Sequence, residues 1–245
     1  MFNLYRHSVD SSSISEAIGR TTTKEIKEMT LFRLDASIRV EGSRSRELAD
    51  IVEREWLSTN PDAGIIRRSV GTEPIPSTAW GTAAFAGYAP ETDRTPDQRE
   101  AVRLAAELAD ELLVADAFVF AVPLYNYGVS QHFKSWVDMI ITDPRFNPSE
   151  PPAIAGKPAI LVTVHGGYYA EGTPRHGWDH ATAWMQRILA DVWGLDIHTV
   201  VSEFSLVGVN PALDEFKELA ATLRSDADNR ARELGRWLTA PSASR

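Results

Sequence analysis

Cysteine is absent from this chain of 245 residues. Its absence excludes disulfides, thiol nucleophiles and thiolate metal sites, and fits a protein of the reducing cytoplasm. No apolar run approaches the roughly 20 residues that a membrane-spanning helix needs. The N-terminal segment also lacks the apolar core of a signal peptide, because Asp10 and three serines interrupt it. These absences predict a soluble, cytoplasmic protein without membrane contact.

An excess of basic residues is missing as well. The 34 acidic residues outnumber the 25 basic ones, so the formal net charge is -9, and no element concentrates lysine and arginine. This balance argues against a nucleic-acid partner. Among the histidines, His176 and His180 alone have a metal-like spacing, but no H-E-x-x-H pattern accompanies them. We therefore expect solvated histidines and no metal site.

The first 28 residues are rich in serine, threonine and charge, without a sustained apolar period. We interpret residues 1–28 as an N-terminal extension that is loosely ordered. Met29 follows directly and fits a start of translation, so a misplaced start and a real tail both stay open. The apolar content of 43% supports one substantial core. Residues 29–240 are therefore predicted to form a single domain.

A run of six apolar residues from Ala117 to Val122 predicts a strand that is buried on both faces. The strand is expected to end at Pro123, which has no amide proton for a sheet ladder. A short aromatic loop follows. From Phe133 to Ile141 apolar residues recur at intervals of three and one, which predicts a helix with Ser130 as its N-cap.

Similar patterns predict four more strands, at 30–34, 63–70, 157–164 and 195–201. They also predict a helix after Ser45 with Leu48, Ile51 and Val52 inward, a helix from Thr95 with apolar positions up to Leu113, and helices around 181–193 and 211–238. The helix that starts at Thr95 has a capping box with Gln98. Residues 72–93 show no clear period and are expected to be irregular. Strands alternating with helices predict an α/β fold. We expect a three-layer sandwich, with a five-stranded parallel sheet of order 2-1-3-4-5 and helices on both faces.

Ligands of such sheets bind at the carboxyl ends of the strands, where three polar loops are expected to meet. The first loop carries Ser37, Ser43, Arg44 and Ser45 just before a helix. Hydroxyls, a guanidinium and free helix amides suit a phosphate monoester. With Gly42 as its single glycine, the loop matches neither the G-x-G-x-x-G dinucleotide turn nor a P-loop. An ordinary N-cap beside solvated arginines is an equally good interpretation.

The second loop spans Tyr125 to Tyr127, and its aromatic and amide side chains can flank a planar heterocycle. The third loop spans His165 to Gly167. Its glycines allow close backbone approach, and its amides, together with His165, can stabilise negative charge on a reduced ring. Ordinary surface turns with an exposed histidine are the alternative. One phosphate site and two ring-facing loops together describe a site for flavin mononucleotide (FMN).

From about Met29 to Leu238 the chain resembles the FMN-dependent NADH-azoreductases and the flavodoxin-like NAD(P)H:quinone oxidoreductases. The segments that carry the resemblance are Ser37 through Ser45, Glu73-Pro-Ile-Pro76, Thr95-Pro-Asp-Gln98, Pro123-Leu-Tyr-Asn-Tyr127 with its Lys134 helix, and His165-Gly-Gly167. The Pro-Leu-Tyr-Asn-Tyr segment is the most specific. The resemblance implies that FMN is held by Ser37, Ser43, Arg44, Ser45, Pro123, Leu124, Tyr125, Asn126, Tyr127, Val164, His165, Gly166 and Gly167.

The same resemblance implies an enzyme that takes hydride from NADH or NADPH and passes two electrons to a quinone or azo compound by a ping-pong mechanism. Since the flavin carries the chemistry, no protein residue is expected to be catalytic. Tyr127, Tyr168 and Trp178 are the candidate walls of the acceptor pocket. A homodimer with the site at its interface is also implied, and tryptophans that look exposed in the sequence support it.

Two features depart from the family pattern. Position 165 is often arginine in relatives and is histidine here, and the loop after Gly167 is longer and more aromatic than the short form. Both bear on the identity of the acceptor more than on the flavin. Two other functions stay open: a non-catalytic flavodoxin-like FMN electron carrier, and a flavodoxin-like binding module without flavin.

Overall fold

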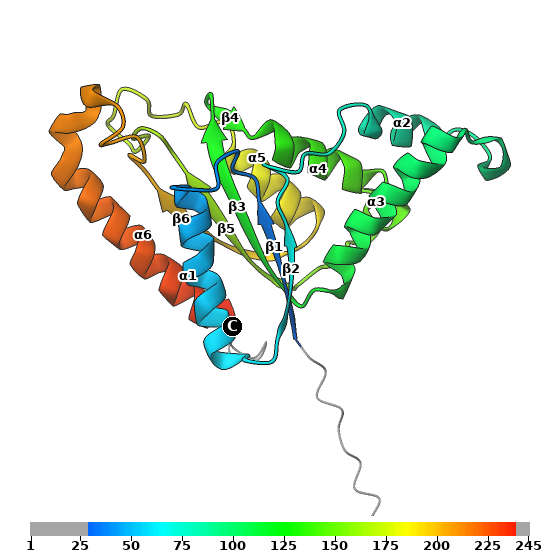
Figure 1. Cartoon of the computed structure of the whole chain (residues 1–245), viewed down its shortest axis with the longest axis horizontal. Coiled ribbons are helices and arrows are strands. Elements are labelled where there is room, and N and C mark those ends of the chain that lie inside the picture. Colours follow the sequence, from blue (N-terminus) through cyan, green and yellow to red (C-terminus); the bar gives the residue numbers. More distant parts are fainter. Residues whose placement is uncertain (1–28, 239–245) are drawn as a thin grey trace, which may run out of the picture.

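A sheet of five parallel strands forms the centre of the protein, whose computed structural model describes residues 29–238. The strands run in the order β2-β1-β3-β5-β6, which confirms the predicted order, and their carboxyl ends lie together at the top of Figure 1. The predicted extension 1–28 and residues 239–240 lie outside the described range. The parallel strands are β1 (Thr30–Asp35), β2 (Gly64–Arg68), β3 (Ala117–Tyr125), β5 (Pro158–Val164) and β6 (Asp196–Ser202), and a short sixth strand that was not predicted, β4 (Gly128–Val129), pairs antiparallel with the end of β3.

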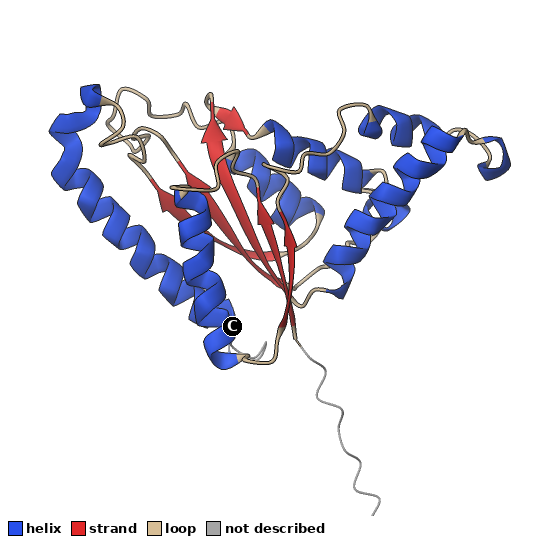
Figure 2. Cartoon of the chain, viewed as in Figure 1, coloured by secondary structure: helices blue, strands red, loops and turns tan. Residues whose placement is uncertain are grey.

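Helices cover both faces of the sheet, as Figure 2 shows, and this confirms the predicted three-layer fold. One face carries α1 (Arg44–Thr59) and α6 (Lys217–Leu238), and the other carries α2 (Ala79–Ala86), α3 (Pro96–Val114), α4 (Gln131–Ile141) and α5 (Thr182–Gln186). Short helical turns are η1 (Glu91–Asp93), η2 (Pro144–Phe146), η3 (Arg187–Val192) and η4 (Pro211–Phe216). No helix within residues 29–238 is long and apolar enough to span a membrane.

The sheet has an apolar core on each face, because successive side chains of a strand point to opposite sides. Phe118 and Phe120 of β3 point into the core beneath α3 and α4, where Phe32 stacks on Trp136 with ring centroids 5.9 Å apart. Val119 belongs to the opposite core, with residues of α1 and α6. The uninterrupted apolar run of β3 is therefore explained by burial on both faces.

The predicted end of the central strand at Pro123 is wrong, because β3 continues through Pro123 to Tyr125. Pro123 pairs with Val164 of β5, whereas the pairing of β3 with β1 ends at Ala121 opposite Asp35. Ala121 accepts a hydrogen bond from the Ala36 amide on the β1 side, so the nitrogen two residues later faces the same side. Within residues 29–238 no strand pairs with Pro123 on that side, so proline costs this sheet no hydrogen bond.

The segment 72–93 is not wholly irregular, since it contains α2 and η1. Ala79, Ala83 and Ala86 of α2 are buried, while Trp80 and Phe85 are exposed. The buried positions of this helix are small and its exposed positions include large apolar residues, so the sequence does not show the usual helical period of large apolar residues. The helix predicted over 181–193 is α5 followed by the π-helical η3. The capping box of α3 is present as predicted, with Thr95 accepting from the Gln98 amide.

Candidate functional site

The loops after β1, β3, β5 and β6 meet at the carboxyl edge of the sheet and enclose a hollow of about 210 Å³. Nine of the thirteen predicted cofactor residues line it. The structure adds four residues that the sequence analysis did not assign to the cofactor: Arg39, Gly42, Ser205 and Leu206. The hollow is lined by Ser37, Arg39, Gly42, Ser43, Arg44, Ser45, Pro123, Leu124, Tyr125, Val164, Gly166, Ser205 and Leu206.

Contacts of the Arg46 side chain hold the first loop in place. Its guanidinium donates to the Ser37 carbonyl at 3.2 Å and to the Ser69 hydroxyl at 2.7 Å, and it pairs with Asp35 at 3.2 Å. A Cβ on Gly71 would lie 2.0 Å from the Ser37 carbonyl oxygen, so only glycine fits there. These contacts hold the buried Ser37 hydroxyl at the rim of the hollow.

Ser43 occupies the N-cap position of α1, but its hydroxyl does not cap the helix. It lies 3.3 Å from the Ser45 hydroxyl, and both side chains are buried beside the hollow. The amides of a first helical turn have no acceptor within the helix and carry partial positive charge. Two hydroxyls and these amides at the start of α1 are groups that could hold an anion.

The guanidinium of Arg44 turns away from the anion site that its sequence position predicts. It donates to the Ser202 hydroxyl at 3.1 Å, the Arg224 carbonyl at 3.0 Å and the Asp228 carboxylate at 2.6 Å. The Arg44 side chain therefore connects α1 to α6 and β6. Only the backbone amide of Arg44 is left to bind an anion at the start of α1. Arg39, which is exposed at the rim, is the guanidinium that this loop leaves available.

The second loop is a β-hairpin in which Tyr125 of β3 pairs with Gly128 of β4 (Gly128–Val129). Its two turn residues, Asn126 and Tyr127, have φ of 49° and 65°. Positive φ at both positions is typical of a type I′ turn, which asparagine tolerates better than tyrosine. A tyrosine in this region is strained, and such strain is concentrated at functional sites.

The hairpin is attached to the first loop through the Tyr125 hydroxyl. This hydroxyl accepts from the Ile38 amide at 3.2 Å and lies 3.5 Å from the Ser37 hydroxyl. The hydroxyl of Ser130, at the N-cap of α4, donates to the Ala36 carbonyl at 3.4 Å instead of capping its helix. The loops after β1 and β3 therefore form one connected wall.

The third loop is extended by the segment after β6. The amide of His165 donates to the Ser202 carbonyl at 2.8 Å, and those of Phe204, Ser205 and Leu206 donate to carbonyls of residues 165–167 at 2.9–3.2 Å. Pairing of β5 with β6 thus continues beyond both strands and brings Ser205 and Leu206 to the hollow. The sequence could have indicated Ser205 and Leu206 as site residues, because they follow the fifth predicted strand and therefore lie at the same edge of the sheet.

The imidazole of His165 is buried behind the loop, which corrects both expectations for it, as a ring-facing group and as an exposed residue. Its side chain is 5% exposed. Nε2 lies 3.4 Å from the Asp179 carboxylate and Nδ1 lies 3.5 Å from the Glu203 carboxylate. The histidine is thus placed between two carboxylates, and of residues 165–167 only Gly166 lines the hollow.

Burial would raise the pKa of Asp179, but hydrogen bonds from Thr182 and from the Ala181 amide, with the nearby His165, hold it below its usual value. Its Oδ1 accepts from the amides of Ala181 and Thr182 at 2.9 and 3.0 Å. Asp179 therefore connects the start of α5 to the loop after β5.

The aromatic residues near the hairpin form two separate groups. Tyr127 packs edge-to-face on Trp178 at 5.4 Å and on Tyr169 at 6.5 Å. Tyr168 instead stacks on Phe204 at 5.1 Å, on the side of η4. Of the predicted acceptor wall, the structure thus brings Tyr127 and Trp178 together, puts Tyr169 beside them, and places Tyr168 elsewhere.

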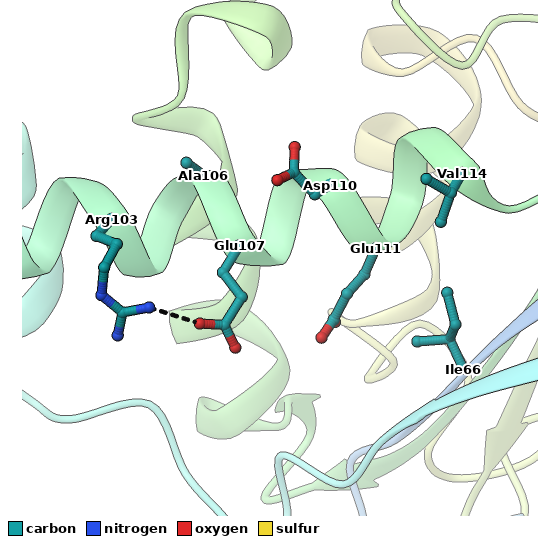
Figure 3. A pocket seen from close by; sticks show the side chains of 7 residues that line it. All are labelled: Ile66, Arg103, Ala106, Glu107, Asp110, Glu111 and Val114. Atoms are coloured by element: carbon teal, nitrogen blue, oxygen red, sulfur yellow. Dashed lines mark hydrogen bonds and ion pairs between the residues drawn. The ribbon is translucent and has the colours of Figure 1, made fainter.

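A wider hollow lies between β2 and α3, where Ile66 and Val114 face each other and acidic side chains line the helix (Figure 3). These carboxylates already have cationic partners. Glu111 pairs with Arg68, Glu107 pairs with Arg103 at 3.0 Å, and Asp110 pairs with an arginine after α4 at 2.6 Å. This hollow is a surface network of ion pairs, away from the carboxyl ends of the strands.

Comparison with known proteins identifies the family of the chain. The flavodoxin-like fold family matches residues 29–226. An FMN-dependent NADH:quinone oxidoreductase of Frankia casuarinae is 37% identical over 82% of this chain and 96% of its own length. One of Streptomyces avermitilis is 32% identical over 84% and 96%.

Solved structures show the same fold. An azoreductase from Bacillus anthracis superposes with a TM-score of 0.68 at 20% identity, over 85% of this chain and 99% of that one. An FMN-dependent NADH-azoreductase from the same species, in complex with FMN, gives 0.66 at 13% identity over 84% and 99%. With its sheet order, its strand-end hollow and relatives that match almost end to end, the chain belongs to the flavodoxin-like FMN-dependent NADH:quinone oxidoreductase family.

Proposed function

We propose that this protein is an FMN-dependent oxidoreductase that transfers two electrons from NADH to a quinone or an azo compound. The observation that carries the proposal is the convergence of three predicted loops on one hollow, with a helix N-terminus at one end and an aromatic hairpin at the other. The relatives named for this activity align over nearly the whole described domain.

The residues present fit FMN. The hollow of about 210 Å³ is smaller than the roughly 300 Å³ or more of pockets that enclose a drug-sized ligand. It suits the phosphate and ribityl end, held by the hydroxyls of Ser37, Ser43 and Ser45 and the first amides of α1. The isoalloxazine would lie between the hairpin and the backbone of residues 165–167, with one face open to substrates.

FMN, when bound, supplies the hydride and electron chemistry. The chain's own residues bind and orient. Pro123 and Leu124 would give the ring an apolar support, Asn126 would offer a donor and an acceptor to its polar edge, and the backbone of Gly166 and Gly167 would hold its other side. Tyr127, Tyr169 and Trp178 form an aromatic wall against which a planar acceptor would stack.

A ping-pong order follows if NADH and acceptor use the same open face in turn. We further propose a homodimer. Trp178 is 48% exposed and Tyr127 41% exposed at the mouth of the site, and a partner would cover them. Fewer tryptophans support a dimer interface than the sequence predicts, because Trp56, Trp136 and Trp193 are fully buried. The use of NADH and the lack of cysteine support the cytoplasm as location.

The test separates the two half-reactions under anaerobic conditions. NADH alone should bleach one protein-bound FMN per chain, and menadione or an azo dye added afterwards should restore its absorbance, at rates that account for steady-state turnover. An electron carrier would take up FMN but show no such turnover with NADH. A colourless protein that does not take up added FMN would overturn the flavin assignment altogether.

A further inference from the structure

The loop after β5 carries a cation, Arg175, that lies against Gly167, whose backbone is proposed to face the flavin ring. A Cβ built on Gly167 would be 2.8 Å from Arg175 Nη1 and 3.9 Å from its Cζ. The guanidinium therefore occupies the space that a side chain at position 167 would fill. On the same side the ring of Tyr169 comes within 3.8 Å of that Cβ, so the cation sits between the glycine turn and the aromatic wall.

Within residues 29–238 the Arg175 side chain has neither a carboxylate partner nor a hydrogen-bond acceptor, although Arg33, Arg44, Arg68 and Arg145 are all ion-paired. Three carboxylates lie in this region, and none of them pairs with Arg175 within residues 29–238: Glu171 is exposed in the same loop, and the other two are already engaged. Asp179 and Glu203 face His165 and accept backbone amides of residues 169, 181 and 182. The positive charge of Arg175 is therefore free to act on whatever binds at Gly167.

We propose that Arg175 stabilises the negative charge of reduced FMN and so sets the redox potential of the site. This inference rests on the proposed function. Hydride transfer brings two electrons and one proton to a neutral ring, so the reduced ring carries one net negative charge. A cation next to the ring favours this form over the oxidised one. A chain of net charge -9 would otherwise oppose the added charge.

Arg175 also accounts for the histidine at position 165. A cation is useful beside the third loop, but the imidazole is directed into the protein between two carboxylates. The long loop after Gly167 supplies a guanidinium from eight residues further along the chain instead. The two departures of this sequence, the histidine and the long loop, are thus parts of one arrangement.

The test measures FMN dissociation constants in both redox states, together with the midpoint potential by dye equilibration, for the wild type, Arg175→Gln and Arg175→Lys. Arg187→Gln is the control, because it removes one charge from an exposed i, i+4 pair with Asp191. Arg175→Gln should lose about tenfold in its preference for reduced FMN, which equals about 30 mV for a two-electron couple. Arg175→Lys should keep most of the preference, and Arg187→Gln all of it.

An oxidised-to-reduced affinity ratio in Arg175→Gln equal to that of the wild type would overturn the role of Arg175 while leaving the flavin assignment intact. An equal shift in Arg187→Gln would do the same, because it would trace the effect to overall charge. A wild-type protein that binds FMN in neither redox state would overturn the proposed function, and the role of Arg175 with it.

Discussion

His165 Nε2 lies 3.4 Å from the carboxylate of Asp179, and this contact joins the loop after β5 to the start of α5. The segment between the two residues contains Tyr169, Arg175 and Trp178, which are the groups placed around the open face of the site. This contact therefore closes the base of the loop whose tip is proposed to meet flavin and acceptor. Glu203, 3.5 Å from Nδ1, attaches the same histidine to the segment after β6.

Asp179→Asn should lower the free energy of unfolding at pH 7 by about 1 kcal/mol, since it removes the charge from hydrogen bonds with two amides and from the contact with His165. The pKa of Asp179 is depressed in the folded protein. Its contribution is therefore present above the unfolded pKa of about 3.9 and is lost as the pH falls through the lower, folded value.

Urea unfolding of wild type and Asp179→Asn between pH 7 and pH 2 checks this expectation. The stability difference should be constant above about pH 5 and narrow below about pH 4. Asp191→Asn is the control, because Asp191 makes an exposed pair with Arg187 and should change stability little at any pH. A difference that grew on acidification would contradict the pairing.

Asn126 has a φ of 49° in the hairpin turn. Its replacement therefore affects both the binding by its amide and the strain of the turn, and a glycine variant separates these two effects. Asn126→Ala removes the amide and also strains the turn by about 1–2 kcal/mol, whereas Asn126→Gly removes the amide alone. If the side chain binds the polar edge of the ring, both variants should bind FMN more weakly in a fluorescence titration. Weakening in the alanine variant only would assign Asn126 to the turn and not to the flavin.

Trp178 and Tyr168 were candidates for the same wall, and the structure separates them. Trp178→Ala removes the partner of Tyr127, and should raise the KM for a quinone roughly three- to tenfold with an unchanged FMN dissociation constant. Tyr168→Ala breaks the stack on Phe204 and should lower thermal stability with little change in KM. Steady-state kinetics and thermal unfolding of both variants decide this. The reverse pattern would exchange the two roles.

The fold could be predicted from the sequence because each element carries its own local signal. The apolar run of β3 indicates burial on both faces, and the capping box at Thr95 fixes the start of α3. The prediction that the central strand ends at Pro123 was wrong. The cost of a missing amide proton depends on whether a neighbouring strand faces it, and this is a property of the sheet that the local sequence does not show. Helix α2 was not predicted because its buried residues are alanines, while the large apolar residues beside them point to solvent.

The loops of the site could be located from the sequence, but the directions of their side chains could not. Membership of strand-end loops followed from position alone. The direction of the Arg44 and His165 side chains depends on partners far along the chain, Asp228 for the first and Glu203 for the second. The exchange of Tyr168 for Tyr169, one residue apart, depends on the path of the loop over Phe204. No local pattern encodes these contacts.

The central claim, that FMN binds with its phosphate at the start of α1, is tested most directly by Ser45→Asp. Ser45 is buried beside the hollow, and a carboxylate there would repel the phosphate. Ser58→Asp, on an exposed turn of the same helix, is the matched control. In fluorescence titrations the wild type and Ser58→Asp should each bind one FMN per chain, and Ser45→Asp should bind about 100-fold more weakly with an unchanged far-ultraviolet circular dichroism spectrum. Wild-type affinity in folded Ser45→Asp would contradict the account.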